Sequence, residues 1–392
     1  MSDVSKSANR DKFGCIEVGR GIAALLVVFH HTGSIMAEPR FFNAEPFGGH
    51  FRNFNVGVDF FFVLSGFIIT WIHWNDIGLQ DRIGAFAAKR FVRIFPSYWF
   101  ILFPLIILYL VVTSAGQPSQ RDPVNIVLSI LLLPYTAQPV LGVAWTLTHE
   151  IFFYALFAVI IWGGRRALMI LPIWAVAILA ANILEARQAI APLAYPFSFF
   201  LSPFDLEFIM GVGAAIVLRH ARIPAPWLVA GTGVVMFLSF MWFFANIQDI
   251  SLVGRLAFGT AATLFVLGVV EIERVRPLKL PKFLLALGAA SYAVYLVHSV
   301  ELSFSINLSS RFGLSTYLSL DTIALGLALV AAAFGIAYHY VIEVRLIKFT
   351  RNIMGPRRRD PIVDRSPVPG SSVLERAMSA AEPEQKISGI EP

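Results

Sequence analysis

Long apolar segments separated by short polar ones make up most of the chain. The apolar runs are about 17–25 residues long, which is the length of a membrane-spanning helix and not of a barrel strand. One further run, Val124 to Leu133, is too short to cross a bilayer and predicts a re-entrant or interfacial segment. We therefore predict an all-α polytopic membrane protein with about ten transmembrane helices. The predicted spans are 16–36, 57–75, 91–112, 144–163, 167–185, 197–218, 226–246, 253–271, 283–303 and 318–342.

The positions of Lys and Arg between the spans predict the orientation. If the N-terminus is cytoplasmic, most of these residues fall in the segments that face the cytoplasm, and the outer loops hold few. Lys and Arg are enriched in short cytoplasmic loops. The alternation therefore predicts ten crossings with both termini in the cytoplasm. The basic residues of the outer loops are Arg40, Arg52, Arg121, Arg187 and Arg311.

Composition supports a membrane protein and excludes several other classes. Hydrophobic residues make up 57% of the chain, and charged residues make up 14%, against about 25% in soluble domains. These values exclude a largely disordered chain and a nucleic-acid-binding domain, and the single cysteine, Cys15, excludes a disulfide scaffold. We predict a cytoplasmic N-terminal segment over 1–15, a transmembrane domain over 16–345 and a disordered cytoplasmic tail over 346–392.

Ionisable residues inside the first span are candidates for function, because such residues are costly in a membrane. This span carries Arg20 near its cytoplasmic end and the adjacent histidines His30 and His31. His31 lies about 16 Å beyond Arg20 along a helix, and a neutral imidazole at that depth could accept a proton. His30 faces about 100° away and is a secondary candidate. The alternative is that His31 only hydrogen-bonds a neighbouring helix.

The second and third spans add an acid, a hydroxyl and a pair of arginines. Asp59 could pair with a histidine, bind an acceptor hydroxyl or cap a helix. Ser65 is a secondary candidate, because Ser beside Gly66 is also typical of close helix packing. Arg90 and Arg93 share a helix face at the cytoplasmic interface. Their guanidinium groups suit phosphates, although they also fit the ordinary cytoplasmic charge bias.

The fourth span opens with Trp145 and carries His149 and Glu150. A lone carboxylate inside the membrane needs a partner, and we expect Glu150 to pair with His31. His149-Glu150 resembles the start of a zinc-protease helix, but Phe153 occupies the position of the second histidine, so we predict no metal site. Further polar residues inside predicted spans are secondary candidates, Glu207 and Tyr292.

These motifs together resemble the membrane acyltransferase-3 family, especially its exopolysaccharide O-acetyltransferase branch. The resemblance covers residues 13–345 and depends on the order and spacing of the motifs. They are Gly19–Leu26 running to His31, Gly57–Phe67, Arg90-Phe91-Val92-Arg93 before Pro96-Ser97-Tyr98-Trp99, and Trp145-Thr146-Leu147 leading to Glu150 and Phe153-Tyr154. The sequence departs from the family at Thr146, where Ser is usual, in the doubled histidine, and in the absence of an esterase-like domain after the last span.

The resemblance implies an O-acyltransferase that moves an acetyl or other acyl group from acyl-coenzyme A to a hydroxyl of a cell-envelope or exported polysaccharide. It implies that His31 is the essential histidine and Glu150 its acidic partner. It also implies that Arg20, Arg90 and Arg93 bind the coenzyme. Acetyl-coenzyme A is then a substrate that donates its acyl group, and no tightly bound cofactor is expected.

On the acceptor side, we hypothesise that a glycan or lipid-linked saccharide approaches past Asp59 and Trp145, whose ring could stack on a sugar. His31 acts as general base toward the hydroxyl or carries the acyl group itself, and the sequence leaves both open. We expect a multi-pass protein of a bacterial inner membrane that contacts lipids and no nucleic acid. The acyl group, the acceptor sugar and homo-oligomerisation stay open.

Two other classes of protein fit part of the pattern. A proton-coupled transporter is one, because buried His and Glu residues also form proton relays. A non-enzymatic partner in polysaccharide export is the other. Only the acyltransferase needs a phosphate site at the cytoplasmic face, so Arg90 and Arg93 distinguish it from both.

Overall fold

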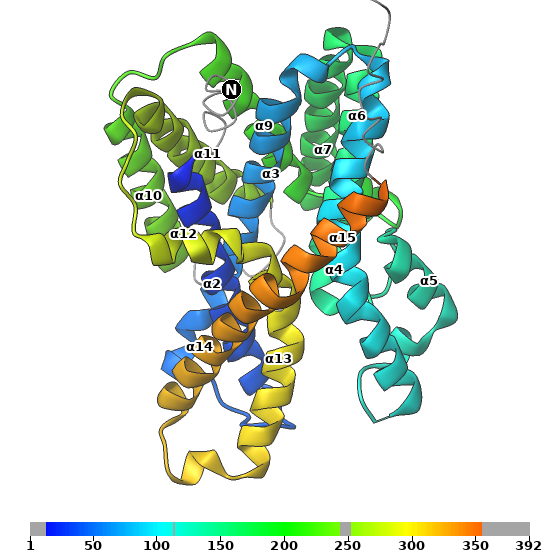
Figure 1. Ribbon diagram of the computed structural model, residues 1–392, viewed down its shortest axis with the longest axis vertical. Helices are drawn as coiled ribbons and strands as arrows, with labels where there is room; N and C mark the ends of the chain where they lie inside the picture. Colours follow the sequence, from blue (N-terminus) through cyan, green and yellow to red (C-terminus); the bar gives the residue numbers. More distant parts are fainter. Residues whose placement is uncertain (1–12, 113, 244–251, 355–392) are drawn as a thin grey trace, which may run out of the picture. The chain divides into compact units, whose positions relative to one another are not determined.

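Helices form every regular element of the residues that the structure describes, which are 13–112, 114–243 and 252–354 of the computed structural model (Figure 1). The chain divides into a unit over Met1–Arg351 and a second unit over Asn352–Pro392. The longer α-helices are α2 (Gly14–Met36), α3 (Gly57–His73), α4 (Ile83–Val111), α6 (Trp145–Gly163), α7 (Ile170–Ala186), α9 (Phe204–His220), α10 (Pro226–Phe243), α11 (Leu252–Val275), α13 (Ser291–Arg311) and α14 (Leu320–Tyr338). The shorter ones are α5 (Pro123–Leu131), α8 (Phe197–Phe200), α12 (Lys282–Ala289) and α15 (Val344–Met354).

The all-α polytopic class is confirmed. In the described residues, 8 helical segments are long and apolar enough to cross a membrane, and a bent pair of helices makes up to 9. The helix over Pro226–Trp242 is apolar but shorter, and the predicted span there, 226–246, runs into residues outside the description. The count of ten and the cytoplasmic location of the termini therefore stay predictions. The described helices continue to Met354, and the rest of the predicted tail lies outside the described residues, as do residues 1–12.

The predicted span over 283–303 is wrong as a single straight helix. It is divided between α12 and α13, which are bent by 68°. Helix α12 packs on α2, where Gly288 allows close backbone contact, since a Cβ there would lie 2.0 Å from the carbonyl oxygen of Glu17. The docking of α12 against α2 therefore redirects a continuous apolar segment that hydropathy reads as one span.

Helix α2 lies at the centre of the first unit. It contacts α3, α11, α12, α13 and α14, and all three apolar cores include its side chains. One of these cores joins α2 with α3, α4, α6 and α13 and includes the fully buried ring of Phe153. Because α2 is surrounded by other helices, Arg20 and His31 are held in the interior of the bundle rather than toward lipid.

Helices α3 and α9 pack at close range through two glycines. A Cβ on Gly66 would lie 2.1 Å from the carbonyl oxygen of Phe208, and one on Gly211 would lie 1.9 Å from that of Val63. Small residues of this kind let helix backbones approach each other in membranes. The approach brings Asp59 of α3 beside α9.

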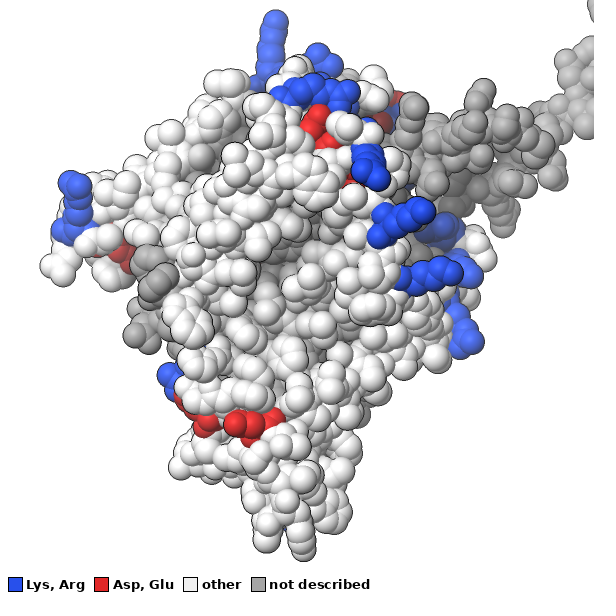
Figure 2. Space-filling view, turned by 90° about the vertical axis from the view of Figure 1, so that its left-hand side faces the viewer, with Lys and Arg blue, Asp and Glu red and all other residues white. Residues whose placement is uncertain are grey.

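The surface agrees with a protein that faces lipid. Large apolar side chains are exposed on α7 and α10, as shown by Val176 at 64% and Leu228 at 71%. Figure 2 shows a broad surface without charged side chains, and most Lys and Arg side chains of this face lie along its upper and right-hand edges in the view. Helix α5 has only 9 residues and begins after Asp122, whose side chain caps it. The segment predicted to be too short to span is therefore a short helix.

Candidate functional site

Two cavities contain nearly all of the predicted site residues. The arginine cavity, of about 230 Å³, is lined by all three arginines predicted to bind the coenzyme. The histidine cavity, of about 450 Å³, is lined by His30, His31 and His149. Val58 and Tyr295 line both cavities, so the two adjoin. Further predicted residues in the arginine cavity are Ser65, Glu150 and Tyr292.

Both arginines of α4 are held by a side chain that the sequence analysis did not single out, Glu343 for Arg93 and His73 for Arg90. Arg93 donates to the Glu343 carboxylate at 2.8 Å, and its guanidinium lies 4.9 Å from the centre of the Tyr292 ring. Glu343 is fully buried and comes from a π-helical segment, His339–Glu343, between α14 and α15. An arginine has five N–H donors, so this ion pair leaves others for a ligand in the cavity.

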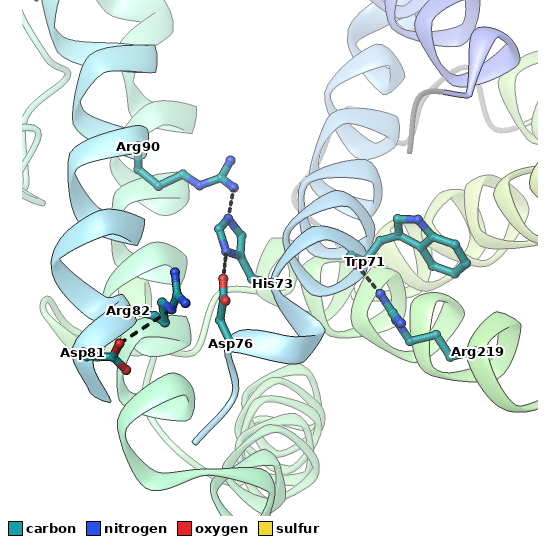
Figure 3. Close-up of polar contacts among 7 residues, drawn as sticks. All are labelled: Trp71, His73, Asp76, Asp81, Arg82, Arg90 and Arg219. Atoms are coloured by element: carbon teal, nitrogen blue, oxygen red, sulfur yellow. Dashed lines mark hydrogen bonds and ion pairs between the residues drawn. The ribbon is translucent and has the colours of Figure 1, made fainter. Parts of the chain in front are cut away.

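Arg90 is held by a chain of polar contacts at the end of α3 (Figure 3). The His73 Nδ1 lies 2.7 Å from an Asp76 carboxylate oxygen, and its Nε2 lies 2.8 Å from a terminal nitrogen of Arg90. A carboxylate only accepts hydrogen bonds, so Nδ1 carries the proton and Nε2 accepts from Arg90. The ring of Tyr154 lies beneath the same guanidinium, with its centre 5.4 Å away. His73 therefore fixes the direction of Arg90.

Glu150 lies in the arginine cavity and not beside His31. It accepts hydrogen bonds from the Ser65 hydroxyl at 3.4 Å and from the Tyr154 hydroxyl. The expected contact between Glu150 and His31 is therefore wrong. The reason is the helical geometry of α6, on which adjacent residues face about 100° apart. His149 faces the histidine cavity and Glu150 faces the arginine cavity.

His31 pairs instead with His298 of α13. The Nδ1 of His298 lies 3.1 Å from the Val294 carbonyl oxygen, and its Nε2 lies 3.2 Å from the Nδ1 of His31. A carbonyl oxygen only accepts, so the Nδ1 of His298 carries the proton and its Nε2 accepts one from His31. The same Nδ1–H of His31 also lies 3.0 Å from the Val27 carbonyl oxygen. The Nε2 of His31 therefore keeps its lone pair, and no described residue donates a hydrogen bond to it.

The other predicted residues of the histidine cavity take several positions. The His30 Nδ1 lies 2.9 Å from the Arg52 carbonyl oxygen. Trp145 lines the cavity as expected. Asp59 does not; it is fully buried and bonds at 2.6 Å to Arg255, which lines the cavity. Glu207 is also fully buried and does not line the cavity.

A hydrogen-bonded pair lies between the two cavities. The hydroxyls of Thr146 and Tyr295 are 2.7 Å apart, and the Tyr295 hydroxyl also lies 3.1 Å from the Val143 carbonyl oxygen. The hydroxyl of Thr146, at the position where the resemblance expects Ser, makes this contact. Tyr295 lies 149 positions from Thr146 in sequence, and no local pattern could have paired them.

The described residues contain no group of three or more His, Cys, Asp or Glu side chains that could hold a metal ion.

Comparison with known proteins decides the family. Residues 13–342 match the acyltransferase domain of the acyltransferase-3 family. The chain belongs to this family. It is therefore a multi-pass membrane acyltransferase. The two cavities just described are lined by the polar residues that carry the resemblance, Arg20, His31, Arg90, Arg93 and Glu150.

Three curated proteins are similar to this chain. The exopolysaccharide production protein ExoZ of Rhizobium meliloti (strain 1021) is 30% identical over 79% of this chain and 94% of its own length. The acyltransferase MdmB of Streptomyces mycarofaciens is 26% identical over 89% of this chain and 95% of its own. Protein 2 of the picA locus of Rhizobium radiobacter is 26% identical over 44% of this chain and 95% of its own. No solved structure matches the chain.

Proposed function

We propose that this acyltransferase moves an acetyl group from acetyl-coenzyme A to a hydroxyl of a cell-envelope or exported polysaccharide, in a bacterial inner membrane. The observation that carries the proposal is the pair of adjoining cavities, one lined by three arginines and the other by three histidines. The similarity to an exopolysaccharide production protein supports a saccharide acceptor. The acceptor is then a glycan or a lipid-linked saccharide.

The arginine cavity binds the donor. Arg20, Arg90 and Arg93 come from two helices and meet around one space, and guanidinium groups bind phosphates through charge-assisted hydrogen bonds. Glu150 lies among them and balances part of their charge when no donor is bound. Its place in the mechanism is then on the donor side and not as the partner of His31.

The histidine cavity binds the acceptor, and His31 is its general base. The sugar hydroxyl gives its proton to the Nε2 of His31, and its oxygen attacks the thioester carbonyl carbon. The carbon–sulfur bond breaks, and the coenzyme leaves as a thiolate that takes the proton back from the imidazolium. His298 and the Val27 carbonyl share the Nδ1–H during this step and so stabilise the charged ring. Because His31 lines the acceptor's cavity, the geometry favours direct transfer over an acyl-histidine.

The test of function is the ester-linked acetate on surface polysaccharide, measured by proton NMR. A deletion strain would carry the wild type, His31→Ala or His220→Ala at matched membrane expression. His220 is an exposed histidine outside both cavities and controls for loss of an imidazole. We expect acetate from the wild type and His220→Ala, and none from His31→Ala.

Other outcomes would count against the proposal in different ways. Equal acetate from His31→Ala would remove His31 from the chemistry. No change in acetate in any strain would make the acyl group or the acceptor wrong, and a proton-driven solute flux would then favour a transporter. An acetylated His31 trapped by rapid quenching without acceptor would replace direct transfer by the acyl-histidine route.

A further inference from the structure

A second imidazole in the histidine cavity is prepared in the same way as His31 but by a different partner. The Nδ1 of His149, on α6, lies 3.0 Å from a carboxylate oxygen of Asp205, on α9. Asp205 is fully buried. Because the carboxylate can only accept, the Nδ1 of His149 donates, and its Nε2 keeps the lone pair. Among the described residues, that nitrogen has no hydrogen-bond partner, and the ring lines the cavity.

Aromatic rings pack against the His149 imidazole and line the cavity beside it. Phe199 stacks on the imidazole with ring centres 4.3 Å apart. Trp145 meets it edge-on at 6.0 Å, and Phe204 lies 5.0 Å from Trp145. All three aromatic side chains line the histidine cavity. A sugar ring presents a C–H face to such aromatic surfaces and hydroxyls around its edge, so a hydrogen-bond acceptor beside the rings fits a saccharide.

The charged residues packed around His149 and Arg255 disfavour an anionic acceptor. Asp59, Asp205 and Glu207 are all fully buried there, and the nearby cation is Arg255, which is bonded to Asp59. The charges of Arg255 and Asp59 cancel, and Asp205 beside the neutral His149 imidazole is left unbalanced, so a carboxylate or phosphate on the acceptor would meet net repulsion. A neutral sugar carries no such penalty.

We propose that His149 is an acceptor-binding residue, whose Nε2 accepts a hydrogen bond from a hydroxyl of a neutral sugar ring that lies against Trp145. Asp205 is the positioning residue that fixes the tautomer and direction of the imidazole. His31 remains the base toward the hydroxyl that is acylated, and His149 binds another hydroxyl of the same acceptor. The inference rests on the proposed function and names the class of acceptor for that site.

The test uses the purified full-length protein in lipid nanodiscs with acetyl-coenzyme A as donor. The acceptors are oligosaccharide fragments of the host's polysaccharide from which acetate has been removed. The variants are His149→Leu, Asp205→Asn and the control His220→Leu. We expect His149→Leu to raise the KM for the fragments about three- to tenfold, which is the effect of one lost hydrogen bond. The KM for acetyl-coenzyme A stays at the wild-type value, and His220→Leu behaves as wild type.

Asp205→Asn separates a site role from a structural one. An Asn oxygen can still accept from the Nδ1–H of His149, so this variant keeps more acceptor affinity than His149→Leu. A wild-type KM for the fragments in His149→Leu would overturn the proposal, as would a loss confined to kcat. If His149→Leu folds poorly, acceptor binding measured by saturation-transfer NMR on Trp145→Phe and Asp205→Asn decides, with weaker binding expected in both.

Two more outcomes complete the test. Fragments whose carboxylates have been chemically reduced should react better than the charged originals, and a preference for the charged fragments would overturn the assignment of a neutral ring. A wild-type protein that transfers no acetate from acetyl-coenzyme A would instead refute the proposed function itself. The two failures are therefore distinct, because the second appears before any variant is compared.

Discussion

At the level of single residues, the proton on His31 is placed by a histidine on another helix. His298 directs its own proton to a backbone carbonyl and so offers only a lone pair to His31. His31 responds by donating from Nδ1 and leaving Nε2 for the substrate. A neutral imidazole thus does what a carboxylate does in a catalytic triad.

His298→Leu should lower kcat about tenfold and leave both KM values near wild type. Leucine removes one acceptor of the Nδ1–H, but the Val27 carbonyl remains, so the tautomer is weakened and not lost. His298→Gln should recover part of the rate, because its amide oxygen can accept the same proton. Initial rates with the purified protein check this, and an unchanged kcat in the leucine variant would exclude His298 from the mechanism.

The sequence predicts the residue types of the site better than their pairing. Arg20 and His31 are correctly placed in the interior, because their spacing on one helix is a local property. The partner of His31 is 267 positions away, and the sequence contains nothing that ranks His298 above Glu150. Only the folded packing of α13 on α2 decides between them.

At the level of helices, apolar length predicts where spans lie but not how they end or bend. The run 283–303 contains no proline, and its one charged residue, Glu301, lies well inside α13, so nothing in the sequence marks the division between α12 and α13. Helix α4 begins at Ile83, well before the predicted span at 91, because helical structure continues through the polar residues around Arg90. Hydropathy measures how strongly a segment prefers lipid, and a helix can extend past the apolar segment into polar residues.

Gly211→Ala should destabilise the protein, whereas Gly213→Ala on the same helix should not. A Cβ at Gly211 would collide with the α3 backbone, and one at Gly213 meets nothing within 4 Å. Overpacking of this kind costs about 1–3 kcal/mol, while alanine in open space gains helix propensity. Thermal unfolding of the detergent-purified variants measures the difference. Equal melting temperatures would show that α3 and α9 are not in close contact.

His73→Ala should weaken donor binding through Arg90. Without the imidazole, the guanidinium loses the acceptor that directs it, so the KM for acetyl-coenzyme A should rise about three- to tenfold with kcat little changed. His73→Gln keeps an acceptor and should recover part of the affinity. Arg82→Ala is the control, because that arginine is exposed and, in the described part of the chain, its ion-pair partner is Asp81. A fall in kcat alone would contradict a positioning role.

At the level of the whole molecule, the distribution of charge predicts the direction of insertion. Lys and Arg favour cytoplasmic loops, and most basic side chains on one face lie along the upper and right-hand edges of an uncharged surface (Figure 2). The composition alone establishes a membrane protein. The number of crossings is less certain from sequence, because a bent pair such as α12 and α13 has the same hydropathy as a straight span.

Cysteine labelling tests this orientation. In a Cys15→Ser background, which removes the single native cysteine, Arg311→Cys should react with a membrane-impermeant maleimide in intact cells. Arg166→Cys should react only after the membrane is permeabilised. Arg311 lies at the end of α13 and Arg166 between α6 and α7, and the charge pattern assigns them to opposite sides. The reverse labelling pattern would invert the topology.

Helix α2 also sets the length of the donor that the site can use. Arg20 lines one cavity and His31 the other, and a rigid helix holds them about 16 Å apart. A donor whose phosphates bind at Arg20 must deliver its acyl carbon near His31. The long pantetheine arm of coenzyme A meets that requirement. Acetyl phosphate, in which the acyl group is bonded directly to the phosphate, is too short to reach both Arg20 and His31, however reactive it is.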